Sequence, residues 1–505
     1  MKKNFILALL VILVAVASCS FTNKSFDNDD KDKFLLELIS YVLEKGHYEP
    51  KEVNDSFSSN VFDDFIDIID PTKRYFLKSD IREFEKYRFM IDDEIRNTDI
   101  EFFNTVYERL MVRMEEAKDI YKEVLATPFD YTLDESIEID YDEQDFAANK
   151  KELKERWRKQ LKYNTLNVFD NKVDNIISDA NQESGLDADA ILAFNDIPSS
   201  VDKVITEEEA REVTKNTLDE FFDFVGDLER KDWFVQYLNT IVEEFDPHTF
   251  YFAPEEKEKF DIGMSGKFEG IGARLQKKPE GAKIVEIISG GPVWRDQSLE
   301  VGDQILKVGQ EGEEPINIVG MRLEDAIKLI KGPEGTVVDL TVRKVDGTIE
   351  TVSITRDVVE LEESYAKSAT IDAGDVKYGL IDLPKFYVDF EDYSERNAAT
   401  DVAKELERLK EAGAEGIVLD LRDNGGGSLK TVVEMAGLFI KDGPIVQVRS
   451  SGQRKEVHED KDERIQWDGP LVILVNELSA SASEILAAAM QDYKRAVIIG
   501  SKQTF

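Results

Sequence analysis

Residues 417–427 read IVLDLRDNGGG, a stretch that decides how the C-terminal part of the chain folds. The run from Ile417 to Leu421 is typical of a buried strand, and the glycines after it permit a turn with positive φ. Strand-like and helical patterns alternate on both sides of this stretch, which predicts an α/β domain over residues 358–505. Further strands are expected at 471–475 and 496–499, and helices at 398–412, 431–439 and 483–493.

The pattern of the sequence changes twice upstream of this domain. Between residues 251 and 357, short β-rich runs are separated by glycines and one helical segment, which predicts a compact β domain. Between residues 33 and 250 the pattern is helical. Because 505 residues exceed the roughly 250–300 that one core can hold, we expect a multidomain α+β protein. The β-rich runs are 283–288, 304–308, 337–342 and 350–354, and the helical patterns include 103–121, 150–166, 207–244 and 322–330.

The charge of the chain excludes nucleic acid as a partner. The formal net charge is -41, and so acidic a surface repels nucleic-acid phosphates. Acidic residues crowd the segment 131–146 without the ordered spacing of a calcium loop. A solvated loop is expected there, with calcium binding as the alternative. The sequence contains no cluster with metal-ligand spacing, so no metal or other cofactor is implied.

The first twenty residues, MKKNFILALLVILVAVASCS, are typical of an export signal. The stretch Val16-Ala17-Ser18-Cys19 resembles a bacterial lipobox, in which the cysteine is lipidated. We therefore expect a signal peptide over 1–18, a lipid on Cys19 and a polar tether over 19–32. The lipid would hold an exported, periplasmic protein on a bacterial membrane. Ordinary signal cleavage after Ala17 is the alternative.

The glycine turn after Leu421 allows two kinds of site. A phosphate-binding loop would need a Gly-Lys-Ser or Gly-Lys-Thr ending, whereas Ser428 is followed here by Leu429. The other use is an oxyanion hole, in which backbone N–H groups hold a developing negative charge.

A second motif, SASASEILAAA at residues 479–489, follows the expected strand 471–475. A serine at such a strand-to-helix turn can present its hydroxyl as a nucleophile. The alternative is a serine that only caps the N-terminus of an alanine-rich helix.

A third motif lies in the β domain, where FEGIGARL at 268–275 precedes a Gly-Gly-Pro turn at 290–292 and a Val-Gly-Asp turn at 301–303. This order resembles a PDZ domain, in which loop amides hold a C-terminal carboxylate and the next strand pairs with an extended peptide. Each residue could instead belong only to the core. The substrate-binding residues implied by the resemblance are Gly270, Ile271, Gly272 and Ala273 in the loop, and Leu323, Ile327 and Ile330 on the opposite helix.

Together, the Asp-Leu-Arg-x-Asn-Gly-Gly-Gly motif, the Ser-Ala-Ser-Ala-Ser-Glu motif and the PDZ-like segment resemble the tail-specific proteases, also called C-terminal processing peptidases. The resemblance covers roughly residues 60–505 and includes Arg156-Trp157-Arg158 and Asp246-Pro247-His248-Thr249. It implies a crotonase/ClpP-like serine protease domain. It also implies Ser481 as nucleophile, the amides of Gly427 and Ala482 as oxyanion-hole donors, and Asp492 as an auxiliary acid that does not touch Ser481.

The general base of the family is a lysine, whose pKa falls when burial removes its solvation. The family pattern would place this lysine one or two residues beyond Phe505, so the chain resembles a truncated member of the family. Lys502 and Lys494 are the alternatives within the chain. The three histidines lie outside both catalytic motifs, which leaves a Ser–His–Asp triad unsupported but open.

Two functions remain after these observations. The first is a serine endopeptidase that recognises apolar C-terminal tails of exported proteins and cleaves them by acyl-enzyme chemistry. The second is a non-catalytic PDZ-containing lipoprotein that binds peptides.

Overall fold

The computed structural model describes residues 28–184, 206–461 and 463–505, and the chain divides into two compact units. The first unit ends at Tyr251 and the second begins at Phe252. The predicted signal peptide and Cys19 lie outside the described residues. Within those residues, none of the helices is long and apolar enough to cross a membrane.

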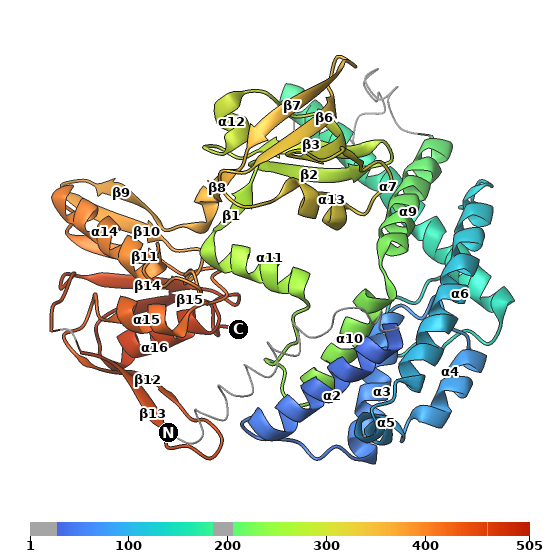
Figure 1. The fold of residues 1–505 in the computed structure, drawn as a ribbon, viewed down its shortest axis with the longest axis horizontal. Helices are drawn as coiled ribbons and strands as arrows, with labels where there is room; N and C mark the ends of the chain where they lie inside the picture. The colour runs from blue at the N-terminus through green and yellow to red at the C-terminus, as the bar shows by residue number, and fades with distance from the viewer. Residues whose placement is uncertain (1–27, 185–205, 462) are drawn as a thin grey trace. The chain divides into compact units, whose positions relative to one another are not determined.

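The first unit consists of helices (Figure 1). Their common core is rich in aromatic side chains. Phe65, Phe102, Phe103 and Tyr237 are almost fully buried, and the centroids of contacting rings lie 5.0–6.3 Å apart. Truncating one such ring to alanine costs about 3–5 kcal/mol. The helices are α2 (Asn28–Gly46), α3 (Asp55–Ile69), α4 (Lys78–Phe84), the 3₁₀ turn η1 (Glu85–Tyr87), α5 (Ile91–Asn97), α6 (Glu101–Leu125), α7 (Lys150–Ser184), α9 (Glu207–Asp227) and α10 (Arg230–Glu243).

The helical pattern predicted over 207–244 is two helices rather than one. Helix α9 begins after Thr206, whose hydroxyl accepts the amide of Glu209 while the carboxylate of Glu209 accepts the amide of Thr206. The carboxylate of Asp232 accepts the amide of Glu229 (2.8 Å) and so starts α10. Residues 131–146 form an irregular loop, as expected.

The second unit begins with α11, which leads into an antiparallel sheet with the order β2-β3-β4-β6-β7 and β5 beside β4. Strands β1 and β8 pair with each other and form a two-stranded ribbon through which the chain enters and leaves this sheet (Figure 1). The four strands predicted here are confirmed. The elements are α11 (Pro254–Ser265), β1 (Lys267–Gly270), β2 (Ala273–Lys278), β3 (Gly281–Ile287), α12 (Pro292–Asp296), β4 (Gln304–Gln310), β5 (Ile316–Asn317), α13 (Leu323–Ile330), β6 (Val337–Arg343), β7 (Ile349–Thr355) and β8 (Asp357–Glu360).

The rest of the second unit is an α/β domain, as the alternating pattern predicts. Its sheet has the order β15-β14-β11-β10-β9, in which only β9 runs antiparallel. Helices α14, α15 and α16 contact one another in that order and share one apolar core with the strands. The elements are η3 (Glu362–Ser364), β9 (Lys367–Ala373), β10 (Val376–Asp382), α14 (Ala398–Glu411), β11 (Gly416–Asp420), α15 (Leu429–Ala436), β12 (Gly443–Val448), β13 (Glu456–Asp460), β14 (Leu471–Val475), α16 (Ala482–Asp492) and β15 (Val497–Gly500).

Candidate active site

Three neighbouring parallel strands bring the predicted catalytic motifs to one edge of the sheet. Strands β10, β11 and β14 lie side by side, so the turns that follow them leave from the same edge. The turn after β11 contains the glycine motif, and the turn after β14 contains the serine motif. A third turn, which follows β10 and includes Phe386, joins them at this edge.

Asn424 connects these three turns. The Asn424 side chain is fully buried; its Nδ2 donates to the carbonyl of Leu383 (2.8 Å) and its Oδ1 accepts the amide of Gly426 (2.9 Å). The carbonyl of Asn424 accepts the amide of Ala480 (3.1 Å) and the hydroxyl of Ser483 (2.8 Å). The glycine turn and the serine turn are therefore held together by buried hydrogen bonds.

Ser481 occupies the residue position just before α16, with φ 54° and ψ −110°. Such a left-handed conformation costs a non-glycine residue about 1–3 kcal/mol and occurs at functional sites. Ser481 is exposed, and its hydroxyl makes no hydrogen bond with any residue that the structure describes. Its amide donates to the carboxylate of Glu484 (2.9 Å). Ser481 therefore stands at the N-cap position of α16, but its hydroxyl forms no capping hydrogen bond.

Gly426 packs directly against this serine. A Cβ added at Gly426 would lie 2.8 Å from Cβ of Ser481, 2.9 Å from the carbonyl oxygen of Ala480 and 3.0 Å from the nitrogen of Ala482. A Cβ at Gly427, where φ is +143°, would lie 2.4 Å from the carbonyl oxygen of Phe386. Only glycine allows both close approaches.

Two amides beside Ser481 are available to a ligand. Within the described residues, the N–H groups of Gly427 and Ala482 donate to no backbone carbonyl. Gly427 is fixed by its bridge with Phe386, and Ala482 is the first residue of α16. Free amides at a helix N-terminus and in a glycine turn are suited to hold a negative oxygen.

The segment that follows β15 returns to the serine turn. The amide of Phe505 donates to the carbonyl of Ser479 (3.2 Å), and the hydroxyl of Thr504 donates to the carboxylate of Glu484 (2.6 Å). Lys502 is exposed in this segment, and Lys494 is exposed beyond the end of α16.

The remaining charged candidates lie on other elements of the α/β domain or at the far end of α16. Asp492 is the exposed last residue of α16, roughly 16 Å along the helix from Ser481 at about 1.5 Å per residue. His458 lies on β13, in the two-stranded β12–β13 hairpin. Burial alone would raise the pKa of Asp420, but hydrogen bonds from Arg422 bring that pKa below its ordinary value. This ion pair (2.6 Å) stabilises the start of the glycine turn.

The predicted peptide-binding loop lies between β1 and β2. Gly270 ends β1, Ala273 begins β2, and the amides of Ile271 and Gly272 donate to no backbone carbonyl in the described chain. Gly272 has φ +77°, and a Cβ there would lie 3.0 Å from the Cα of Gly291. These free amides suit a carboxylate.

The predicted groove helix, α13, contacts β2. Leu323 and Ile327 are half-buried on this helix, whereas Ile330 and the loop residue Ile271 are each only 3% exposed and belong to the core of the β domain. Of these four predicted groove residues, only Leu323 and Ile327 are therefore partly exposed.

Three residues that organise the site were not identified from the sequence. Asn424 stands inside the recognised motif, but its side chain acts on Leu383, 41 residues away. Phe386 pairs with Gly427 from another turn. Glu484 orients the amide of Ser481, and the serine–x–x–glutamate spacing of a capping box was a signal that could have identified it.

Three family models match the chain in order. The model described as the tail specific protease N-terminal domain matches residues 39–255, the PDZ domain matches residues 260–343, and peptidase family S41 matches residues 377–505. The chain therefore has a helical N-terminal domain, a PDZ domain and a serine protease domain.

Several proteases are similar in sequence. A tail-specific protease of Haemophilus influenzae is 32% identical over 462 residues, which are 91% of this chain and 60% of that protein. A carboxy-terminal processing protease of Bacillus subtilis is 34% identical over 257 residues, 50% of this chain and 51% of that protein. The PDZ domain of a carboxy-terminal protease from Vibrio cholerae, solved with a peptide, is 42% identical and covers 19% of this chain and 99% of that one, with a TM-score of 0.18.

The chain spans 60% of the length of the Haemophilus protease and 51% of the length of the Bacillus protease. The three domain models follow one another along it in a single order, and the similarity to the Haemophilus protease extends through nearly all of it. The chain is therefore similar to tail-specific proteases in each of its three domains and in the order of those domains.

Proposed function

We propose that this chain is the greater part of a serine endopeptidase that binds C-terminal tails of exported proteins and cleaves them by acyl-enzyme chemistry. The observation that carries the proposal is the contact between Gly426 and Ser481, which sets a free serine hydroxyl beside two unpaired amides. A hydroxyl next to a ready oxyanion hole is the minimum that acyl transfer requires.

In this proposal Oγ of Ser481 attacks the scissile carbonyl and its proton passes to a base. The carbonyl oxygen becomes negative and accepts hydrogen bonds from the amides of Gly427 and Ala482. Collapse of this intermediate expels the amine and leaves the acyl group on Ser481, and water then releases it. The buried hydrogen bonds of Asn424 support the role, because both amides are fixed before the charge develops.

The proposed base is a lysine, in keeping with the family resemblance. Lys502 lies in the segment 501–505, whose end is hydrogen-bonded next to Ser481. In a longer protein, a residue that follows Phe505 would be within reach of the same hydroxyl, and we favour that position over Lys502. Asp492 remains proposed as an auxiliary acid that acts on the stability of α16 and not on the substrate.

The PDZ domain suggests that peptides bind here, and we propose that it holds the apolar tail of the substrate. The amides of Ile271 and Gly272 would donate hydrogen bonds to the terminal carboxylate, with Gly270 and Ala273 shaping the loop. The tail would add a strand to β2, and its side chains would contact Leu323 and Ile327. Ile330 would support this surface from the core.

The test is Ser481→Ala in the complete protein, with Ser451→Ala, an exposed serine between β12 and β13, as the matched control. Cleavage of a polypeptide with an apolar tail should fall by a factor on the order of 10⁴–10⁶ in the Ser481 variant only. Tail binding, measured by fluorescence anisotropy, should remain in both variants. Equal cleavage by Ser481→Ala and wild type would remove Ser481 from the mechanism. Tail binding without cleavage by the wild-type protein would favour the non-catalytic binding lipoprotein.

We also propose that the protein is exported and carries a lipid on Cys19, which would attach it to a bacterial membrane. The support is the sequence of residues 1–20, and the bacterial relatives are consistent with export. Mass analysis of the mature N-terminus should detect an acylated cysteine. A lipid-free terminus after Ala17 would contradict the anchor and support ordinary cleavage.

A further inference from the structure

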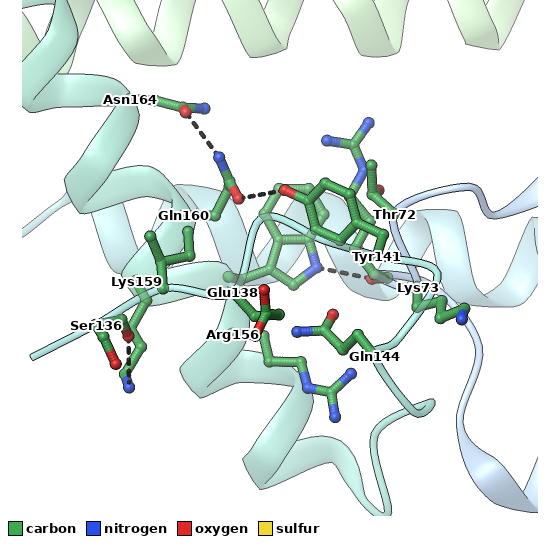
Figure 2. A pocket seen from close by; sticks show the side chains of 13 residues that line it. Thr72, Lys73, Ser136, Glu138, Tyr141, Gln144, Arg156, Lys159, Gln160 and Asn164 are labelled. Atoms are coloured by element: carbon green, nitrogen blue, oxygen red, sulfur yellow. Dashed lines mark hydrogen bonds between the residues drawn. The ribbon is translucent and has the colours of Figure 1, made fainter.

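The helical unit contains a pocket of about 600 Å³ that the proposed protease chemistry does not use (Figure 2). The pocket lies between the N-terminal half of α7 and the segments 72–74 and 136–144. Its volume is within the range of small-ligand sites, about 300–1,000 Å³. One wall is Trp157, from the Arg-Trp-Arg motif, whose indole N–H donates to the carbonyl of Arg74 (2.9 Å).

The pocket is positively charged in a strongly acidic protein. Its lining includes the cations Lys73, Arg74, Arg156 and Lys159, and Glu138 is the one carboxylate among the lining residues. The chain as a whole has a formal net charge of -41. A local excess of cations in such a chain favours an anionic ligand.

Three of these cations already bind the loop 131–146. Nζ of Lys73 donates to the carbonyl of Asp142 (3.2 Å), and Nζ of Lys159 donates to the carbonyl of Ser136 (3.1 Å). Figure 2 shows the second of these bonds at the rim of the pocket. Arg156 donates to the carbonyl of Asp145 (2.6 Å). Because carbonyl groups leave the charge of a cation unneutralised, Lys73 and Lys159 still contribute positive potential.

Arg74 differs from the other three cations. Its guanidinium lies 5.3–5.5 Å from the ring centroids of Tyr75, Trp157 and Phe221. Its Nε is buried and has no hydrogen-bond partner among the described residues. The acid of the same turn, Asp70, uses its oxygens to accept the amides of residues 74, 75 and 76. A buried donor without an acceptor is unfavourable, and a guanidinium presents forked donors that match a carboxylate or phosphate.

We propose that this pocket binds a small multivalent oxyanion, carrying carboxylate or phosphate groups, with Arg74 as its principal contact. Lys73 and Lys159 supply further positive charge, whereas Arg156 is already paired with the carboxylate of Glu152 (2.6 Å). A neutral sugar is the competing ligand, since Trp157 and nearby amides are suited to sugars. However, the hydroxyl of Tyr141 donates to Oε1 of Gln160, and Nε2 of Gln160 donates to Oδ1 of Asn164 (2.9 Å each), so these groups already bind one another (Figure 2).

Isothermal titration of the full protein at constant ionic strength tests the proposal, with citrate, inorganic phosphate and maltose as probes and chloride as the reference salt. We expect one site for citrate or phosphate, and the tighter of the two identifies the carboxylate or phosphate source. Arg74→Gln should weaken that binding at least tenfold. Arg82→Gln, an exposed arginine that donates to the carbonyl of Lys78, should leave it within twofold.

A second variant tests the proposal even if Arg74→Gln does not fold. Lys159→Gln removes only one hydrogen bond, to the carbonyl of Ser136, and should weaken the anion two- to fivefold with an unchanged circular dichroism spectrum. Binding of maltose alone, absence of binding by both anions, or equal anion affinity in wild type, Arg74→Gln and Lys159→Gln would each overturn the proposal.

Discussion

Replacing Gly426 with alanine should abolish the proposed peptide cleavage while leaving most of the fold intact. The new methyl group would lie 2.8 Å from Cβ of Ser481 and 3.0 Å from the nitrogen of Ala482. Neither atom is at the end of a flexible side chain, so the turn itself must shift. Since φ at Gly426 is +102°, alanine there also adds strain of about 1–3 kcal/mol.

The loss of activity can be estimated from the groups that move. In the proposed mechanism, a displaced Ala482 amide amounts to the loss of one oxyanion-hole donor, which costs about 10²–10³ in kcat. Gly413→Ala is the matched control, because its φ of +82° brings similar strain while no atom lies within 4 Å of the new Cβ. We would compare kcat/KM for a tail peptide and the midpoint of urea unfolding in both variants of the complete protein. Equal activity in Gly426→Ala and Gly413→Ala would refute the contact between the glycine turn and the nucleophile.

Two further predictions concern stability. Asp303 is fully buried and accepts Nζ of Lys344 (2.5 Å) and the amide of Val345 (3.2 Å), so Asp303→Ala should destabilise the PDZ domain by about 3–5 kcal/mol, measurable by urea unfolding. Burial, helped by neighbouring acids, raises the pKa of Glu94 to about 7. In the unfolded chain this carboxyl has a pKa of about 4.3. The free energy of unfolding of the helical unit should therefore decrease as the pH rises from about 4 to 7. Glu94→Gln should therefore raise the urea midpoint at pH 8 and not at pH 4; an equal effect at both values would contradict the assigned pKa.

About half of the elements of the fold follow from local patterns in the sequence. The strand predicted at 471–475 coincides with β14, and the helix predicted at 398–412 ends one residue beyond α14. These segments are apolar on the faces that the core buries, so their patterns are strong. Strands β9 and β13 were not predicted, because strands with mostly exposed residues have no apolar alternation.

The candidate site was predictable where it depends on motifs and not where it depends on distant pairing. The glycine turn and the serine turn each have a local signature. Ser481 was interpreted either as a nucleophile or as a helix cap, and the structure agrees with part of each: Ser481 precedes α16, but its hydroxyl does not cap the helix. The buried side chain of Asn424 and the bridge from Phe386 connect segments about 40 residues apart. A single sequence contains no signal for such contacts.

The ribbon formed by β1 and β8 has a consequence for how tail-specific proteases diversify. Because Gly270 in β1 pairs with Asp357 in β8, the segment that enters the PDZ sheet and the segment that leaves it are neighbouring strands of one ladder. A domain whose two ends lie side by side can be replaced by another domain. If the ends of the new domain are equally close, β1 and β8 would keep their positions. Recognition of new tails could then evolve by transplantation, with the hydrolytic apparatus inherited unchanged.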